Sequence, residues 1–211
     1  MDDADEAALW ATLREDPNDA PAFHRLAAIV RQRAAERQIE AVEGDPQRAA
    51  DDAVWSLAEE LAHSGKAWYP LVELARLSLH DDREAALRRL GTAADRDPDG
   101  HGLATALGML RDARMPGDAV NLGVGHWRPR DHDLSVGRQL VEASIEAGRI
   151  GDARRHLAAL LTHPEVERAK EIRDELEPLI EAAEAALPPR TPAGGMPLID
   201  LRELREPRRA D

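Results

Sequence analysis

The densest group of residues that could do chemistry is His126-Trp127-Arg128-Pro129-Arg130-Asp131-His132-Asp133. Imidazoles and carboxylates are ligands that zinc and other transition metals accept. Pro129 lies between the two histidines, and their spacing does not place both rings on one face of a helix. We therefore interpret this stretch as a turn between helices, with Trp127 packed and His126 at a helix contact, and predict no metal site. Metal-dependent catalysis centred on His126, His132 and Asp133 stays as an alternative.

No other motif indicates catalysis. Gly123-Val124-Gly125 follows an expected helix rather than a strand, and it lacks the third glycine of a dinucleotide-binding fingerprint. The sequence contains no P-loop, no Gly-x-Ser-x-Gly elbow and no His-Glu-x-x-His motif. It also contains no cysteine, which excludes a thiol nucleophile and a thiolate metal site. We predict a protein that is not an enzyme and that uses no cofactor.

The charge of the chain narrows the classes of partner. Its formal net charge is −13, which argues against nucleic acid and against an anionic membrane surface, because both attract basic proteins. The first residues lack the basic start and apolar run of a signal peptide, and no apolar run approaches the roughly 20 residues of a membrane span. We expect a cytoplasmic protein with a protein or peptide partner.

The spacing of apolar residues predicts an all-α chain that must position whatever site exists. Helices are expected over about 5–15 and 23–42, and again from Pro46 to about 62. Three helical hairpins should follow over 68–98, 101–128 and 133–162, with turns at 80–82, 115–118 and 147–148. A last long helix is expected from Pro164 to about 187. The helical body is thus assigned to residues 1–187 and a separate tail to 188–211.

In the hairpin expected over 68–98, the spacing of apolar and small residues resembles that of a known repeat family. These residues are Trp68, Leu71, Val72 and Ala75, then Ala86, Leu90, Ala93 and Pro98. They resemble the signature of tetratricopeptide repeats (TPR), in which small residues lie where two helices approach closely and Pro ends the second helix. Similar steps recur in four hairpins over about residues 8–162, although the first contains an insertion around 32–47. The scarcity of lysine beside abundant arginine and alanine is typical of a GC-rich bacterial genome.

The resemblance implies a short right-handed solenoid whose first helices line a groove for a peptide. Transferring the groove positions gives His24, Arg31, Lys66, Tyr69, Glu73, Arg76, Thr105, Met109, Asp112, Arg138 and Glu142. Arg76, Lys66 and Tyr69 are expected to form a cationic pocket for a carboxylate; the alternative is a solvated face with local pairs such as Glu73–Arg76. Ala28 and Pro70 replace residues that chaperone-binding members use, so we do not expect chaperone binding.

The tail carries a second candidate for an interaction. A Pro- and Gly-containing linker precedes a short apolar segment whose docking residues would be Leu198, Ile199, Leu201 and Leu204. This segment could dock on the body of its own chain, on a second copy or on a partner, or it could simply cover the last helix. We therefore predict a non-enzymatic adaptor, with a self-assembling structural protein that uses this tail as the alternative.

Overall fold

The computed structural model describes residues 3–41 and 45–186, and in these ranges the chain forms ten α-helices and no strand. The helices are α1 (Asp3–Glu15), α2 (Ala20–Ala41), α3 (Pro46–Ala62), α4 (Tyr69–Ser78), α5 (Arg83–Arg96), α6 (His101–Asp112), α7 (Pro116–His126), α8 (Leu134–Glu146), α9 (Ile150–Leu160) and α10 (Val166–Ala185). The prediction of an all-α chain is confirmed. The described part contains no helix that is both long and apolar enough to cross a membrane.

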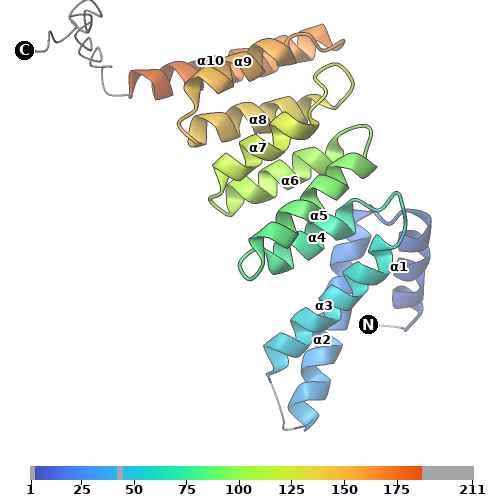
Figure 1. The fold of residues 1–211 in the computed structure, drawn as a ribbon. Coiled ribbons are helices and arrows are strands. Elements are labelled where there is room, and N and C mark those ends of the chain that lie inside the picture. The colour runs from blue at the N-terminus through green and yellow to red at the C-terminus, as the bar shows by residue number, and fades with distance from the viewer. Residues whose placement is uncertain (1–2, 42–44, 187–211) are drawn as a thin grey trace, which may run out of the picture.

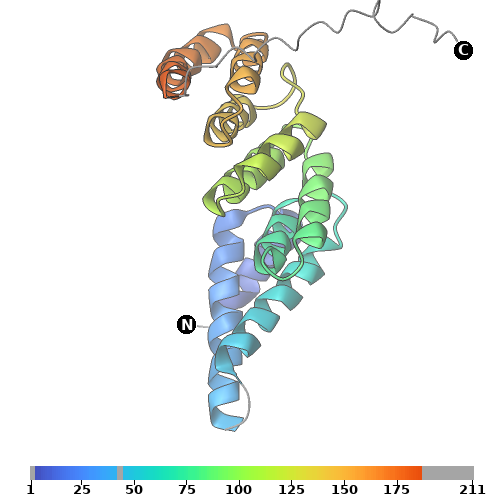
Figure 2. The same cartoon turned by 60° about the vertical axis from the view of Figure 1, so that its left-hand side comes forward.

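The helices pack as four successive hairpins, α2–α3, α4–α5, α6–α7 and α8–α9 (Figure 1). The first helices of neighbouring hairpins also touch, since α4 contacts α6 and α6 contacts α8. Helix α1 packs on α2, and α10 packs on both helices of the last hairpin. Figure 2 shows the hairpins stacked one above another, with α10 beside the last of them and α1 beside the first. This packing is consistent with a helical repeat.

Three helix starts are fixed by aspartate caps that can be recognised in the sequence. Asp45 accepts from the N–H of Gln47 ahead of Pro46, Asp82 accepts from Ala85, and Asp133 accepts from Ser135. Each cap satisfies a backbone N–H that has no partner inside the helix and contributes about 1 kcal/mol. The Asp-Pro start expected at residue 46 is confirmed.

Helix α4 is instead capped by a residue from another turn. Its N-cap residue Trp68 supplies no side-chain cap, but Asn18 Oδ1 accepts from the N–H groups of Trp68 and Tyr69 at 2.8 and 3.0 Å. In return, Lys66 Nζ donates to the carbonyl oxygen of Glu15 at 2.6 Å, at the end of α1. The turn before α2 and the turn before α4 therefore hold each other in place.

The buried core consists of two apolar clusters that meet at Trp127. The larger cluster runs from α1 to α8, and the smaller one joins α8, α9 and α10. Glycines allow close packing where the helices meet, because a Cβ at Gly123 would lie 2.6 Å from Leu140 and one at Gly137 would lie 2.7 Å from Leu160. A core poor in aromatic residues is thus built from short distances between helices.

The first hairpin differs from the others in length. The insertion expected around residues 32–47 extends both of its helices, so α2 has 22 residues and α3 has 17, whereas α4 has 10. The expected continuation to Val42 falls outside the described residues. So do Leu187 and the tail, and with them the docking residues Leu198, Ile199, Leu201 and Leu204.

Candidate functional site

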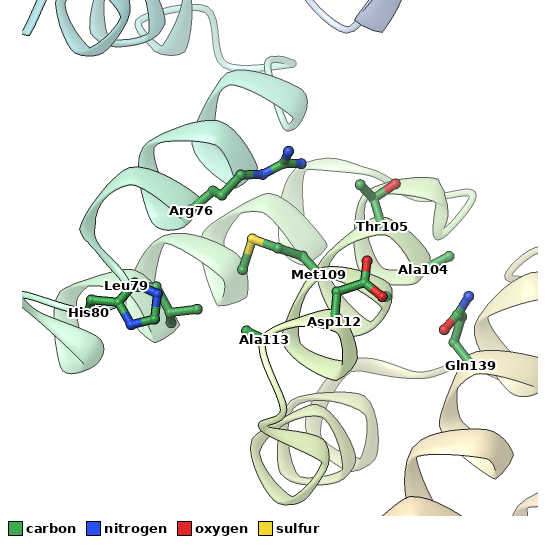
Figure 3. A pocket seen from close by; sticks show the side chains of 10 residues that line it. Arg76, Leu79, His80, Ala104, Thr105, Met109, Asp112, Ala113 and Gln139 are labelled. Carbon is green, nitrogen blue, oxygen red and sulfur yellow. The ribbon is translucent and has the colours of Figure 1, made fainter. Parts of the chain in front are cut away.

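A pocket of about 540 Å³ opens between the first helices α4, α6 and α8. Its lining residues are Arg76, Leu79, His80, Ala104, Thr105, Gly108, Met109, Asp112, Ala113 and Gln139. Figure 3 shows Arg76 and Leu79 on one side of Met109 and Gln139 on the other side. Four residues that the TPR resemblance proposed, Arg76, Thr105, Met109 and Asp112, therefore lie around one pocket.

A second pocket of about 420 Å³ continues the first one between α6 and α8. Gly108, Asp112 and Gln139 line both pockets, and Arg111, Arg114 and Glu146 line only the second. Because the two pockets share three residues, we treat them as one surface depression and call it the groove. The groove crosses α4, α6 and α8, which are the first helices of three successive hairpins.

The groove residues on α8 are not the two that were expected. The turns Ala113–Ala119 and Ala147–Ala153 share the pattern Ala-x-x-x-Gly-Asp-Ala exactly 34 residues apart. The same offset relates Thr105 to Gln139 and Asp112 to Glu146, and both Gln139 and Glu146 line the groove. Arg138 and Glu142 line neither pocket, and the 34-residue match is the signal in the sequence that indicates Gln139 and Glu146.

Arg138 and Glu142 belong to a chain of ion pairs that links three helices. Arg111 of α6 donates to Glu142 and also to Glu146, where the Nη2–Oε1 distance is 2.6 Å. Arg138 pairs with Glu175 of α10. These charged groups fix the spacing of α6, α8 and α10, so Arg111 serves as a link between helices rather than as a free cation.

Further toward the N-terminus, polar groups connect α2 to α4. The hydroxyl group of Tyr69 lies 2.8 Å from Nε2 of His24. Burial and the nearby Glu73 carboxylate raise the pKa of Tyr69. Glu73 is buried, and its Oε1 lies 3.1 Å from Arg76 Nη2 without making a hydrogen bond. The half-exposed Arg76 is thus only partly neutralised at the groove.

The expected cationic pocket of Arg76, Lys66 and Tyr69 is not formed. Lys66 is held by the Glu15 carbonyl, and Tyr69 is buried against His24, so of the three only Arg76 lines the groove. Arg31 does not line it either, since it lies on α2, where it pairs with Asp51 of α3 at 3.5 Å. The reason is that the turn before α4 bonds to the turn before α2, which removes the Lys66 ammonium from the groove.

Arg114 is a groove residue that sequence reasoning missed. Its φ of 60° makes it the one non-glycine residue with positive φ in the described ranges. Its side chain lines the groove, and within those ranges it makes no ion pair. In the matching turn 34 residues later, the same backbone position is taken by Gly148 with φ 68°. A strained residue with a free charge beside a pocket is typical of a functional position.

The three residues of the metal hypothesis have separate roles in the structure. His126 Nδ1 lies 3.0 Å from Asp95 Oδ1, and the Asp133 side chain caps α8. His132 is 1% exposed, neither of its ring nitrogens has a hydrogen-bond partner, and burial lowers its pKa. Across the described residues, no group of three or more His, Asp or Glu side chains is arranged to hold a metal ion.

Comparisons of the chain with protein-family models, with curated proteins and with solved structures find no match. The resemblance to tetratricopeptide repeats therefore rests on the residue spacing and on the packing of the hairpins. What the protein does has to be argued from the groove itself.

Proposed function

We propose that this chain is a non-enzymatic adaptor, built from four TPR-like hairpins in a right-handed solenoid, that holds an extended peptide segment of a partner protein in the groove. The observation that carries this proposal is the groove itself, which crosses three parallel first helices. With neighbouring helix axes about 8–10 Å apart, it extends over roughly 20 Å. That length accommodates about six residues of extended chain at about 3.3 Å each.

The lining of the groove suits a peptide. Its apolar lining consists of the half-buried Ala104 and Ala113 and of the small exposed edges of Leu79 and Met109, which are otherwise buried. Gln139 provides an amide group that can bond to a peptide backbone, while Arg76 and Asp112 offer charges of opposite sign. A mixture of apolar area and a few polar groups is typical of sites that bind a chain rather than a metal or a phosphate.

The same lining lacks the arrangement of a nucleophilic enzyme. Thr105 carries the one hydroxyl group among the groove residues, and this hydroxyl donates to the backbone carbonyl of His101 at 2.8 Å. Among residues 3–41 and 45–186, no base is hydrogen-bonded to it. Activation of a hydroxyl nucleophile requires such a base, so the geometry favours binding over catalysis.

Self-assembly by stacking on α10 is the less favoured proposal. Helix α10 buries Ala169, Ile172, Leu176 and Ile180 against the last hairpin. Its exposed acids are Glu167, Glu171, Asp174, Glu175, Glu177, Glu181 and Glu184, and they outnumber the exposed bases Arg168 and Lys170 and the exposed apolar residues Val166 and Leu179. A largely polar outer face is typical of the helix that closes a repeat stack, and the excess of acids disfavours contact between two copies of this face.

The groove can be tested with a matched pair of glycine substitutions. A Cβ at Gly108 would be 3.7 Å from Gln139, so Gly108→Gln fits the backbone but places a side chain in the part of the groove that both pockets share. A Cβ at Gly125, on α7, would meet nothing within 4 Å, so Gly125→Gln is the control. Both changes replace a helical glycine by a better helix former.

The probe is a peptide selected from a random dodecapeptide library displayed on phage, using the full chain as bait. We expect Gly108→Gln to weaken binding of the selected peptide at least tenfold and Gly125→Gln to leave it unchanged, as measured by fluorescence anisotropy. Equal affinity for both variants, or a library that yields no binder, would contradict the proposal.

A further inference from the structure

The end of α10 lies close to the groove. Arg154, near the start of α9, pairs with Glu184, near the end of α10, which places this end beside the α8–α9 turn. The α4–α5, α6–α7 and α8–α9 turns lie on the same side of the stack, as Figure 1 shows, and we call this side the turn edge. Along it, Arg83 pairs with Asp118 and Arg149 bonds to Asn121. The groove reaches the turn edge at Arg114 and Glu146.

The chain beyond α10 is long enough to reach the groove. The part of the groove between α6 and α8 lies about two helix spacings from α10, which is at most about 20 Å. Residues 187–196 can span up to about 33 Å when extended. Residues 197–204 can therefore enter the groove from the turn edge without any change in the helices.

The chemistry of residues 197–204 complements the groove. The apolar side chains of this segment are Leu198, Ile199, Leu201 and Leu204. Their counterparts in the groove are the half-buried Ala104 and Ala113 and the small exposed edges of Leu79 and Met109. The segment also contains Asp200, Arg202 and Glu203, so it carries two acids and one base. About six of its residues, at about 3.3 Å each, are enough to cross the groove in an extended conformation.

One positive charge of the groove is free to pair with an acidic side chain of residues 197–204. Of the three arginines that line the groove, Arg111 is paired with Glu142 and Glu146 and Arg76 is partly neutralised by Glu73, which leaves Arg114. Arg114 has no ion-pair partner in the described ranges and is available to Asp200 or Glu203. Asp112, which is exposed, is available to Arg202.

We propose that residues 197–204 of the chain occupy its own groove when no partner is bound. This inference rests on the proposed function, because the segment would act as an internal competitor of the partner peptide. A tethered segment has an effective concentration in the millimolar range, so a partner has to displace it and binds less tightly in its presence. The segment thereby raises the concentration of partner that is needed to fill the groove.

A spin label can locate the segment because the chain contains no cysteine. We place a nitroxide on Ala193→Cys in the full chain and measure paramagnetic broadening of backbone amides by NMR. We expect broadening at Gly108 and Asp112 in the groove and none at Gly125, which lies at the end of α7 away from the turn edge. Leu201→Asp combined with Leu204→Asp should abolish the broadening, whereas Ala210→Asp should not.

A mixed sample distinguishes the chain's own segment from that of a second copy. Isotope-labelled chain without the spin label is mixed with unlabelled chain that carries it, and broadening in this mixture would show an occupant from another molecule. That result, or broadening that does not respond to Leu201→Asp with Leu204→Asp, would overturn the inference.

Peptide binding gives an independent readout. In the full chain, Leu201→Asp with Leu204→Asp should tighten binding of the phage-selected peptide at least threefold, because the internal competitor is lost. If this affinity does not change while Gly108→Gln still weakens it, the internal occupant is refuted and the peptide-binding groove stands. If neither variant affects peptide binding, the proposed function itself fails.

Discussion

The turn between α6 and α7 and the turn between α8 and α9 follow the same backbone path but differ at one position. In the first turn, Met115 N–H donates to the Leu110 carbonyl at 2.8 Å, and in the second, Arg149 N–H donates to Ser144 at 2.8 Å. The residue before each donor has positive φ, and glycine takes this position only in the second turn. In the first turn the position belongs to Arg114.

The difference between Arg114 and Gly148 shows that the residue favoured by the turn is not the residue found beside the groove. A left-handed conformation is free of steric conflict for glycine but costs other residues about 1–2 kcal/mol, so the turn itself favours Gly148. Arg114 lines the groove, whereas Gly148 lines neither of its two pockets. The turn with the less favourable residue is the one that contributes a charged side chain to the candidate site, which is where strain in proteins tends to occur.

The largest expected loss of stability comes from a substitution at Gly100, the third residue with positive φ. Gly100 has φ 87°, and a Cβ there would lie 2.7 Å from the buried His132 ring. Gly100→Ala therefore combines backbone strain with a steric clash and should lower the free energy of unfolding by about 3 kcal/mol. Urea denaturation monitored by circular dichroism measures this loss, and a change below that of Gly148→Ala would contradict the assigned packing.

The same substitution in the two matched turns tests the role of backbone strain alone. A Cβ at Gly148 would meet nothing within 4 Å, so Gly148→Ala adds strain without a clash and should lower the free energy of unfolding by about 1 kcal/mol. Arg114→Ala should change it by less than about 0.5 kcal/mol, because the strain is already present. Equal losses in both turns, measured by thermal denaturation, would mean that they do not share one backbone path.

Arg114→Gly tests whether Arg114 lowers the stability of the fold while it strengthens peptide binding. Removing the strain should raise the free energy of unfolding by up to about 1 kcal/mol. The same change should weaken an acidic peptide bound in the groove, because the free guanidinium is lost. Denaturation and fluorescence anisotropy on one preparation check both effects, and a gain in stability with unchanged binding would make Arg114 a tolerated residue rather than a functional one.

A small effect is expected from protonation of the buried His132, in the loop between α7 and α8. Burial lowers the pKa of His132, so the unfolded chain, with a pKa near 6.5, takes up the proton first as the pH falls. Stability should therefore decrease as the pH falls below about 7, by at most about 0.7 kcal/mol between pH 7 and 6 for this residue.

The control for this pH dependence is His132→Leu. It should reduce the slope of unfolding free energy against pH but not abolish it, because burial also lowers the pKa of His156 on α9. An unchanged slope in the variant would show that His132 is not the group that resists protonation.

The fold could largely be predicted from the sequence, and the site only in part. Helix starts at Pro46 and after Asp82 and Asp133 follow from local capping, and four groove residues on α4 and α6 follow from the resemblance to a repeat family. Gln139 and Glu146 on α8 were not among the expected groove residues, although the 34-residue match between the two turns indicates both of them. Arg114 was missed because an arginine gives no sign in the sequence of a positive φ.

The sequence by itself determined the type and the ends of the helices, since apolar spacing, aspartate caps and proline act within a few residues of chain. Only the tertiary structure decided which charged side chains remain free for a ligand. Lys66 is bound by a carbonyl 51 residues away, and Arg111 is bound by acids 31 and 35 residues away. Such partners depend on how the hairpins stack, and no pattern local to either residue encodes them.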